Sequence, residues 1–429
     1  MPNILILYYV AHHPMRATAK AHLDSYRQYS GGRCFYINLA MQSLFCILNG
    51  IKFDLIIFDY LFFDSRWDRK AFLTAEARVC ALENSLAPKI ALVQDEFMNM
   101  DLVTDFVRRF SISHVFSLAA PSEWSNIYAS LDFEKVRLHR VLPGYLDESI
   151  IPKIAKMEKQ IPARSVDIGY RTAETWPSAG RFNRIKGNIA ELIMNKAAAK
   201  GFVVDCKVGQ EQFFLGEEWS RFLLKCKYTV SVEGGASILD RDGTLMEKTA
   251  RYLKEHANAD FDELERECFP GREGELTLRS ISPKHLESCA TRTCQILVEG
   301  DYNGILKAGE HYLELKKDFS NFEEILDTIK QDDLRIQIVD RAYRDVVQSG
   351  LYSYRNFVET ILRPVLPTSC MESRGGGIIF LAYALTCFLD KLSFFWLAVY
   401  YATLRFSKKM LPGSVWIILK NTKRRMRRG

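Results

Sequence analysis

Short apolar runs alternate with helix-like stretches along most of this 429-residue chain. In the first part, the apolar runs lie at residues 3–10, 34–37, 53–58, 89–93, 114–117 and 138–143, with helical spacing over 12–29, 71–86 and 100–110. This order is typical of βαβ units, whose strands are parallel and whose crossovers are right-handed. We therefore expect a parallel α/β sheet that binds ligands at the carboxyl ends of its strands.

A second series of the same kind begins after residues 149–165, a charged segment with two prolines that we interpret as a linker. Expected strands lie at 166–170, 202–207, 228–232 and 296–298, and expected helices at 188–200 and 219–226. The length suffices for two or three domains. We predict two Rossmann-like domains, over residues 1–150 and 164–345, followed by a helix over 346–365 and a tail over 375–429.

The net charge of +6 is unevenly distributed along the chain. Nine Lys or Arg and no Asp or Glu follow from Arg405 onward, so the remainder holds 49 basic residues against 52 acidic ones. A nearly neutral body does not favour a broad nucleic-acid surface, and we expect no nucleic-acid partner. Ten cysteines without a C-x-x-C pair indicate reduced thiols in a cytosolic protein.

In the first half, the carboxylates Asp95 and Glu96 follow the expected strand at 89–93. At the end of a parallel strand, either one can take a proton from an acceptor hydroxyl. The alternative is that Asp95 caps a helix that begins at Glu96. Both interpretations stay open from the sequence.

In the second half, basic residues and glycines follow the expected strands. Arg171, Arg181 and Lys186 lie near a strand end and a helix start, where two phosphates can be neutralised. The loop from Glu233 to Ser237 contains Gly234, and its glycines allow close approach of a ligand to the backbone. The alternative is a solvated helix face and an ordinary tight turn.

The segment from residue 281 to 321 has the strongest pattern. Ser282-Pro283-Lys284 precedes a helix-like run that holds Glu287, and Glu310 follows in a later loop. A hydroxyl, an ammonium group and free N–H groups at a helix N-terminus suit an anion. A carboxylate one helical turn further on can accept bonds from a ribose diol. An ordinary strand–helix connection with solvated charges is the alternative.

These motifs resemble those of two-domain GT-B glycosyltransferases, near the bacterial family-1, family-4 and spore-maturation types. The resemblance rests on SPKHLE at 282–287, DFSN at 318–321, DIGYR at 167–171, GRFNRIKG at 180–187 and EGGAS at 233–237. It implies two Rossmann-like domains facing each other across a cleft, with the helix at 346–365 crossing back to the first. One position departs from the pattern, because Arg279 stands where many retaining members have a second glutamate.

The resemblance also implies a donor site for a nucleotide-diphosphate sugar and no other cofactor. The residues that it and the spacing assign to donor binding are Arg171, Arg181, Lys186, Glu233, Gly234, Ser237, Ser282, Glu287 and Glu310. Asp95, Glu96 and Lys284 are the candidate catalytic residues. We expect no metal, and interpret the Asp-x-Asp patterns at 240–242 and 260–262 as solvated carboxylates.

The tail differs in kind from the body, since a long apolar run from residue 378 is interrupted by Asp390-Lys391 and followed by a second short run and a basic cluster. We expect it to attach the protein to the cytoplasmic face of a membrane, as a re-entrant hairpin or an in-plane pair of helices. Two short spans and a packed soluble hairpin are alternatives.

The predicted function is transfer of a sugar to a glycan or lipid-linked acceptor in surface polysaccharide synthesis. An epimerase of the same fold and a non-catalytic scaffold are the rivals.

Overall fold

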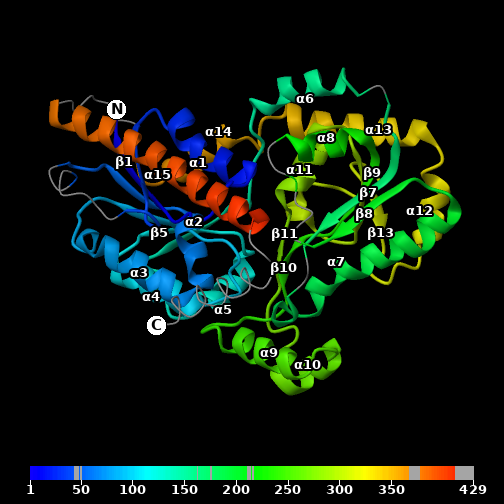
Figure 1. Ribbon diagram of the computed structural model, residues 1–429, viewed down its shortest axis with the longest axis horizontal. Helices are drawn as coiled ribbons and strands as arrows, with labels where there is room; N and C mark the ends of the chain where they lie inside the picture. Colours follow the sequence, from blue (N-terminus) through cyan, green and yellow to red (C-terminus); the bar gives the residue numbers. More distant parts are fainter. Residues whose placement is uncertain are drawn as a thin grey trace.

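The computed structural model describes residues 1–42, 48, 51–161, 163–173, 176–209, 214, 217–366 and 377–410, with the side chains of the last helix described over 379–403. It contains two parallel sheets, each with helices on both faces (Figure 1). The predicted second apolar piece, residues 415–419, and the basic cluster after it lie outside the described residues. The predicted fold class, two Rossmann-like domains, is confirmed.

The first sheet has six parallel strands in the order β2-β1-β3-β4-β5-β6. Their bounds are β1 Asn3–Tyr8, β2 Arg33–Asn38, β3 Leu55–Phe58, β4 Lys89–Leu92, β5 His114–Ser117 and β6 Arg137–Arg140. The helices of this part are α1 Ala17–Tyr29, α2 Tyr60–Phe63, α3 Arg69–Val79, α4 Met100–Arg109 and α5 Trp124–Ile127. Successive residues of β1 pack on opposite faces of the sheet, so the strand is buried on both sides and is apolar throughout.

The second sheet has five parallel strands in the order β13-β12-β9-β7-β8. Their bounds are β7 Val166–Thr172, β8 Val204–Val208, β9 Cys226–Ser231, β12 Cys294–Val298 and β13 Leu313–Leu315. A separate antiparallel pair joins β10 Gly234–Ala236 to β11 Leu278–Ser280. The helices are α6 Ile150–Glu158, α7 Arg181–Leu192, α8 Glu218–Lys225, α9 Thr244–Glu255, α10 Phe261–Cys268, α11 Pro283–Ala290, α12 Phe322–Thr328 and α13 Asp332–Ala342.

Two predicted loops contain helices instead. The expected linker at 149–165 contains α6, whose Ile154 and Met157 are buried against the second domain. The motif at 180–187 was expected to be a loop before a helix at 188, but α7 already begins at Arg181. In both places an apolar stripe at helical spacing is buried, for α6 against α8 and for α7 against the sheet, and this tertiary packing outweighs the local proline and glycine signals.

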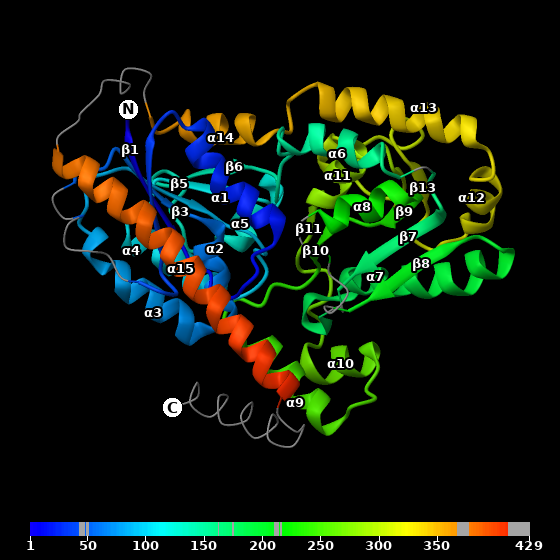
Figure 2. The ribbon, with the colours of Figure 1, turned by 45° about the horizontal axis from the view of Figure 1, so that its top comes forward.

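The chain crosses between the domains twice, and the two crossings pair with each other. Leu146 donates its N–H to Tyr352 at 2.8 Å and accepts from Tyr354 N–H at 3.0 Å. After this point α14, Tyr354–Leu362, packs on the first domain through Phe357, Val358 and Ile361. The last helix, α15 Gly377–Met410, then runs diagonally across the first domain (Figure 2).

Candidate active site

The carboxyl ends of the strands in the two sheets face each other, as contacts between segments near these strand ends show. The Trp67 and Trp176 rings, from loops after β3 and β7, are 5.1 Å apart. A β-carbon on Gly144, which follows β6, would lie 2.6 Å from Cγ of Pro283, the first residue of α11. Ligands of parallel α/β sheets bind at these strand ends.

Backbone hydrogen bonds also join the two domains beside Asp95. Asp240 N–H donates to the Phe97 carbonyl at 2.7 Å, and Asn99 N–H donates to the Asp240 carbonyl at 2.8 Å. Asp101 N–H donates to the Arg241 carbonyl at 3.0 Å. These bonds fix the position of the loop after β4 relative to the second domain.

Two lysines of the second domain supply positive charge at this interface. Lys186 on α7 and Lys284 in the first turn of α11 are half-buried. Neither ammonium group forms an ion pair within the part of the chain that the structure describes. Burial, together with the neighbouring Lys186 ammonium, lowers the pKa of Lys284 to about 7. Burial also lowers the pKa of Lys186, and the Asp95 carboxylate of the first domain opposes that shift. An anion placed between the two lysines would stabilise the charged form of both.

Asp95 is an exposed acidic residue of the first domain at this interface, and its backbone is held in a left-handed conformation with φ 48°. Such a conformation is uncommon for a non-glycine residue and persists where the surroundings fix it. The proposed alternative, that Asp95 caps a helix, is wrong, because residues 96–97 form a turn and α4 begins only at Met100.

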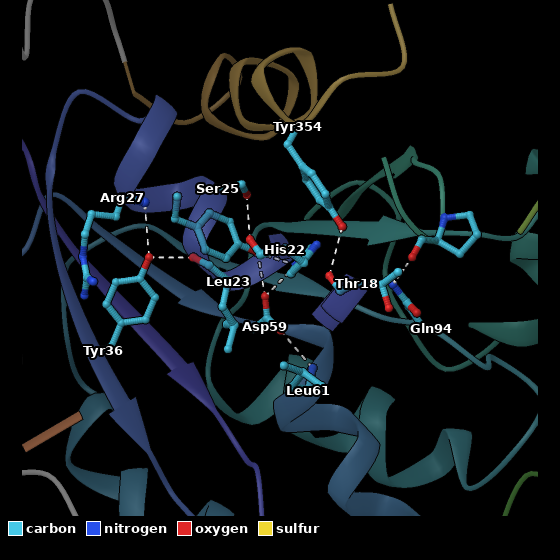
Figure 3. Close-up of polar contacts among 12 residues, drawn as sticks. Thr18, His22, Leu23, Ser25, Arg27, Tyr36, Asp59, Leu61, Gln94 and Tyr354 are labelled. Atoms are coloured by element: carbon cyan, nitrogen blue, oxygen red, sulfur yellow. Dashed lines mark hydrogen bonds and ion pairs between the residues drawn. The ribbon is translucent and has the colours of Figure 1, made fainter. Parts of the chain in front are cut away.

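A buried arginine that sequence reasoning missed holds this loop. Arg66 is fully buried and donates to the carbonyls of Gln94 at 2.7 Å, Asp95 at 2.6 Å and Met98 at 2.9 Å. Its partners are all main-chain oxygens, which carry no sequence signature. Gln94 in turn donates to the Pro143 carbonyl at 3.1 Å (Figure 3).

Asp64 is a second acidic residue that the sequence analysis did not select. Its Oδ1 is buried without a hydrogen-bond partner among the described residues, and Arg66 Nη1 lies 4.0 Å away. Burial raises the pKa of Asp64 to about 7, and the Asp95 carboxylate adds to this shift while Arg66 opposes it. Asp64 and Asp95 therefore form an acidic pair on the first domain.

Glu96 does not face the interface, so the prediction that it acts as a base there is corrected. Its side chain is fully buried and accepts hydrogen bonds from the hydroxyls of Ser117 at 2.5 Å and Tyr128 at 2.6 Å, and from Leu118 N–H at 2.7 Å. These donors leave no room for an acceptor hydroxyl, and Glu96 joins β4 to β5 instead. Asp59, after β3, is likewise buried and bonded to His22 and Tyr26 (Figure 3).

The predicted phosphate ligands Arg171 and Arg181 have other partners. Arg171 is 7% exposed and bonds Asp205 Oδ1 at 2.7 Å, and its guanidinium lies 4.3 Å from the Phe222 ring centroid. Arg181 is exposed and pairs with Asp262 at 2.7 Å and Glu265 at 2.6 Å. Both arginines are thus neutralised by carboxylates of their own domain.

The residues of the loop from Glu233 to Ser237 also have contact partners within the protein. Glu233 is buried and accepts Tyr302 N–H at 2.8 Å. Gly234 pairs with Ser280 in the β10–β11 ribbon. Ser237 is buried at the start of α7, where a β-carbon on Gly180 would lie 2.1 Å from its hydroxyl. The glycines of this region serve close packing of the chain on itself.

The residues of the motif at 282–287 have two different roles: Ser282 caps α11, and Glu287 is a candidate ligand-binding residue. The Ser282 hydroxyl lies 2.9 Å from Nδ1 of buried His285, which also accepts Ser282 N–H, so Ser282 caps the helix. Glu287 accepts a hydrogen bond from Trp219 Nε1 at 2.8 Å, and burial raises its pKa to about 7 against the effect of that bond. Glu287 stays a candidate for the ribose diol.

Glu310 lies at the opposite edge of the sheet from the other candidates. Leu313 is paired with Ile296 near the start of β12, so Glu310, three residues earlier, precedes the amino end of β13. Ligands bind at the carboxyl ends, and the prediction of Glu310 as a donor ligand is corrected.

The Asp-x-Asp patterns cap helices. Asp240 is buried and accepts the N–H groups of Gly243 and Met246 at the start of α9, and Asp260 accepts Glu263 N–H at the start of α10. The prediction that Asp240 is a solvated carboxylate is therefore wrong. Across the described residues, no group of three His, Cys, Asp or Glu side chains is arranged to hold a metal ion.

Comparison with known proteins gives similarity to solved structures alone. No protein-family model matches the chain, and no curated protein matches its sequence. Anabaena Alr3699/HepE, solved in complex with UDP and glucose, aligns with TM-score 0.49 and 11% identity over 85% of this chain and 99% of that chain. Sucrose-phosphate synthase from Thermosynechococcus elongatus aligns with TM-score 0.49 and 8% identity over 85% of this chain and 98% of that chain.

A DNA-modifying β-glucosyltransferase aligns with TM-score 0.48 and 8% identity, over 84% of this chain and 99% of that chain. These values describe distant similarity over nearly the whole of each solved chain. The chain's own topology provides the assignment: two parallel sheets meet at the carboxyl ends of their strands, and α14 returns to the first domain. This protein has the two-domain GT-B fold.

Proposed function

We propose that this protein transfers a sugar from a nucleotide-diphosphate sugar to a hydroxyl group of a glycan or lipid-linked acceptor. The observation that carries the proposal is that Lys186 and Lys284 are neighbours without an ion pair among the described residues, and that the Asp95 carboxylate of the first domain acts on Lys186. Two positive charges on one side and an acidic group on the other suit a leaving diphosphate and an acceptor hydroxyl.

The reaction forms a bond from the acceptor oxygen to the anomeric carbon and breaks the bond from that carbon to the phosphate oxygen. Negative charge then grows on the diphosphate, where the lysine ammonium groups stabilise it without a metal ion. In an inverting reaction Asp95 accepts the hydroxyl proton, with Asp64 beside it. Glu287 holds the ribose.

The test is a thermal-shift screen of the purified protein against UDP-, GDP-, TDP- and CMP-sugars, followed by product analysis with a lipid-linked acceptor. We expect one nucleotide class to raise the melting temperature and release of the free nucleoside diphosphate to require the acceptor. Conversion of the sugar without acceptor would indicate an epimerase. Binding without any turnover would indicate a scaffold. No stabilisation by any nucleotide sugar would contradict the proposal.

A further inference from the structure

The helix α15 has one face packed on the first domain and another face uncovered. Among its inward residues, Ala382, Thr386, Ser393 and Leu397 are at most 6% exposed. Their spacing of four and seven residues places them on a single helix face. On the outward face, Phe380, Phe388, Phe395 and Trp396 are 55–72% exposed. We call these four residues the outer aromatic face.

Polar contacts fix the inward face to the first sheet. The Tyr8 hydroxyl donates to Asp390 Oδ1 at 2.5 Å, and the Phe394 ring stacks on Tyr8 with 6.3 Å between centroids. The Tyr401 hydroxyl donates to the Ala11 carbonyl at 3.1 Å. Asp390, the first of the two charges that interrupt the apolar sequence, is thus directed into the protein and has a partner there, whereas the second, Lys391, is exposed.

These contacts argue against a spanning helix. Within the part of the chain that the structure describes, residues 379–403 form one helix that is long and apolar enough to cross a bilayer. Crossing would break the Tyr8–Asp390 bond, carry a carboxyl group into hydrocarbon and uncover the edge strand β2, on which α15 packs. If α15 stays packed on the first domain, none of these three costs arises.

We propose that α15 is an in-plane membrane-binding helix, whose outer aromatic face enters the surface of an anionic bilayer while its inward face stays bonded to the first domain. The proposal deepens the function proposed above and rests on it for the acceptor: a hydroxyl on a lipid carrier, presented at the bilayer surface.

The distribution of basic residues along the chain favours an anionic bilayer as the partner of the outer aromatic face. The apolar helix leads directly into a segment with nine Lys or Arg and no Asp or Glu from Arg405 onward, whereas the rest of the chain is slightly acidic. An apolar face next to concentrated basic residues is typical of helices that lie on anionic membranes. A second copy of this chain would supply the same apolar face through its own α15, but it would also bring the same nine basic residues to the contact, where the two segments would repel each other.

The orientation of α15 also relates the membrane to the candidate active site. Tyr401 contacts Ala11, which follows the carboxyl end of β1, and Asp95 follows the carboxyl end of β4 in the same parallel sheet. One end of the membrane-binding helix therefore lies at the edge of the sheet where the acceptor is deprotonated. A lipid-linked acceptor reaches Asp95 from the bilayer surface.

Vesicle flotation with the full chain tests the surface. The variant Phe388→Ser/Phe395→Ser/Trp396→Ser removes three exposed rings, and Met194→Ser/Val203→Ser/Ile336→Ser is the matched control, because those side chains are 46–55% exposed in the second domain. On vesicles of phosphatidylcholine and phosphatidylglycerol, we expect partitioning to fall by at least about tenfold in the first variant and to stay unchanged in the control.

Equal flotation of the outer-face variant and the unmodified protein would overturn the proposal, as would absence of flotation of the unmodified protein. Light scattering identifies the other occupant: loss of a dimer in the outer-face variant, without any vesicle binding, would assign the face to a second copy. Donor-induced thermal shifts are measured on the same samples. Flotation without any donor binding would reject the proposed function and keep the membrane-binding helix.

Cross-linking tests whether the helix stays on the domain. Ala11→Cys/Tyr401→Cys places two thiols where the structure has a direct contact. A short bismaleimide should join them equally well with and without vesicles, relative to each single variant. Loss of this cross-link when vesicles are added would mean that α15 leaves the domain to insert, which overturns the in-plane arrangement.

Discussion

The Asp95 carboxylate of the first domain opposes the lowering of the pKa of Lys186 in the second domain, so the two groups interact across the domain interface. Asp95 lies in the loop after β4 of the first sheet, whereas Lys186 lies on α7 of the second domain, far from it in the sequence. Their proximity depends on how the two domains meet. It also gives the candidate site a positive side and a negative side.

Lys186→Ala and Lys284→Ala should each reduce sugar transfer more than binding of the free nucleoside. If each ammonium group meets the leaving diphosphate, its loss should cost about 2–4 kcal/mol in the transition state. Arg181→Ala is the control from the same motif, since Arg181 pairs with Asp262 and Glu265. Steady-state kinetics of the three variants test this prediction. If the two lysine variants transfer sugar as fast as Arg181→Ala, the lysines have no role in transfer.

Affinity for a nucleotide sugar should depend on the ionisation of Lys284, whose pKa lies at about 7 in the free protein. Below this value the ammonium form is already present, so affinity should be constant. Above it, binding must take up a proton, and affinity should fall up to about tenfold per pH unit. Calorimetry in two buffers of different ionisation enthalpy measures the uptake. Lys284→Arg should bind without it, and a flat profile in the unmodified protein would contradict the assignment.

Asp95→Asn and Glu96→Gln should separate chemistry from stability. Asp95 is exposed, so its amide variant should keep the melting temperature and lose kcat if the reaction inverts. Glu96 accepts bonds from several buried donors, so replacing one of its oxygens with an NH₂ group should destabilise the fold by about 1–3 kcal/mol. Urea denaturation and turnover are measured on both variants. A reversed pattern would exchange the two roles.

Arg66→Met should release the loop that carries Asp95. The guanidinium holds three carbonyls between Gln94 and Met98, and methionine fills a similar volume without donors. We expect lower stability, because these buried oxygens lose their partners. Beyond this loss, kcat should fall at a temperature where the variant is still folded, with donor KM unchanged. A parallel rise in donor KM would place the effect in the second domain instead.

Glu287→Ala should abolish donor binding while leaving the fold intact. The carboxylate lies in the motif at 282–287 and bonds Trp219 through one oxygen. Trp219→Phe removes that bond and keeps the carboxylate, so it serves as the control and should bind the donor more weakly but measurably. Calorimetry with the nucleoside diphosphate provides the comparison. Unchanged affinity in Glu287→Ala would exclude this residue from the site.

Strand positions were predictable because β1, β3, β4 and β12 are apolar runs buried on both faces. The candidate site was predictable only in part. Lys186 and Lys284 lie at the interface, but the sequence does not indicate that Arg171 and Arg181 are neutralised by carboxylates 34 and 81 residues away. The role of Arg66 was equally hidden, because main-chain carbonyls can accept from any arginine that the fold brings near.

The two attachments between the domains restrict how they can move. One is the pairing of the two chain crossings at Leu146 and Tyr352, and the other is the backbone pairing of Phe97 and Asn99 with Asp240. A rigid body held at two separate points keeps a single rotational freedom, about the line that joins them. The second attachment lies two residues from Asp95, so rotation about this line keeps Asp95 near the axis and nearly fixed relative to Lys186 of the second domain. Access to the site can therefore change with this rotation while the spacing between its acidic and basic sides is kept.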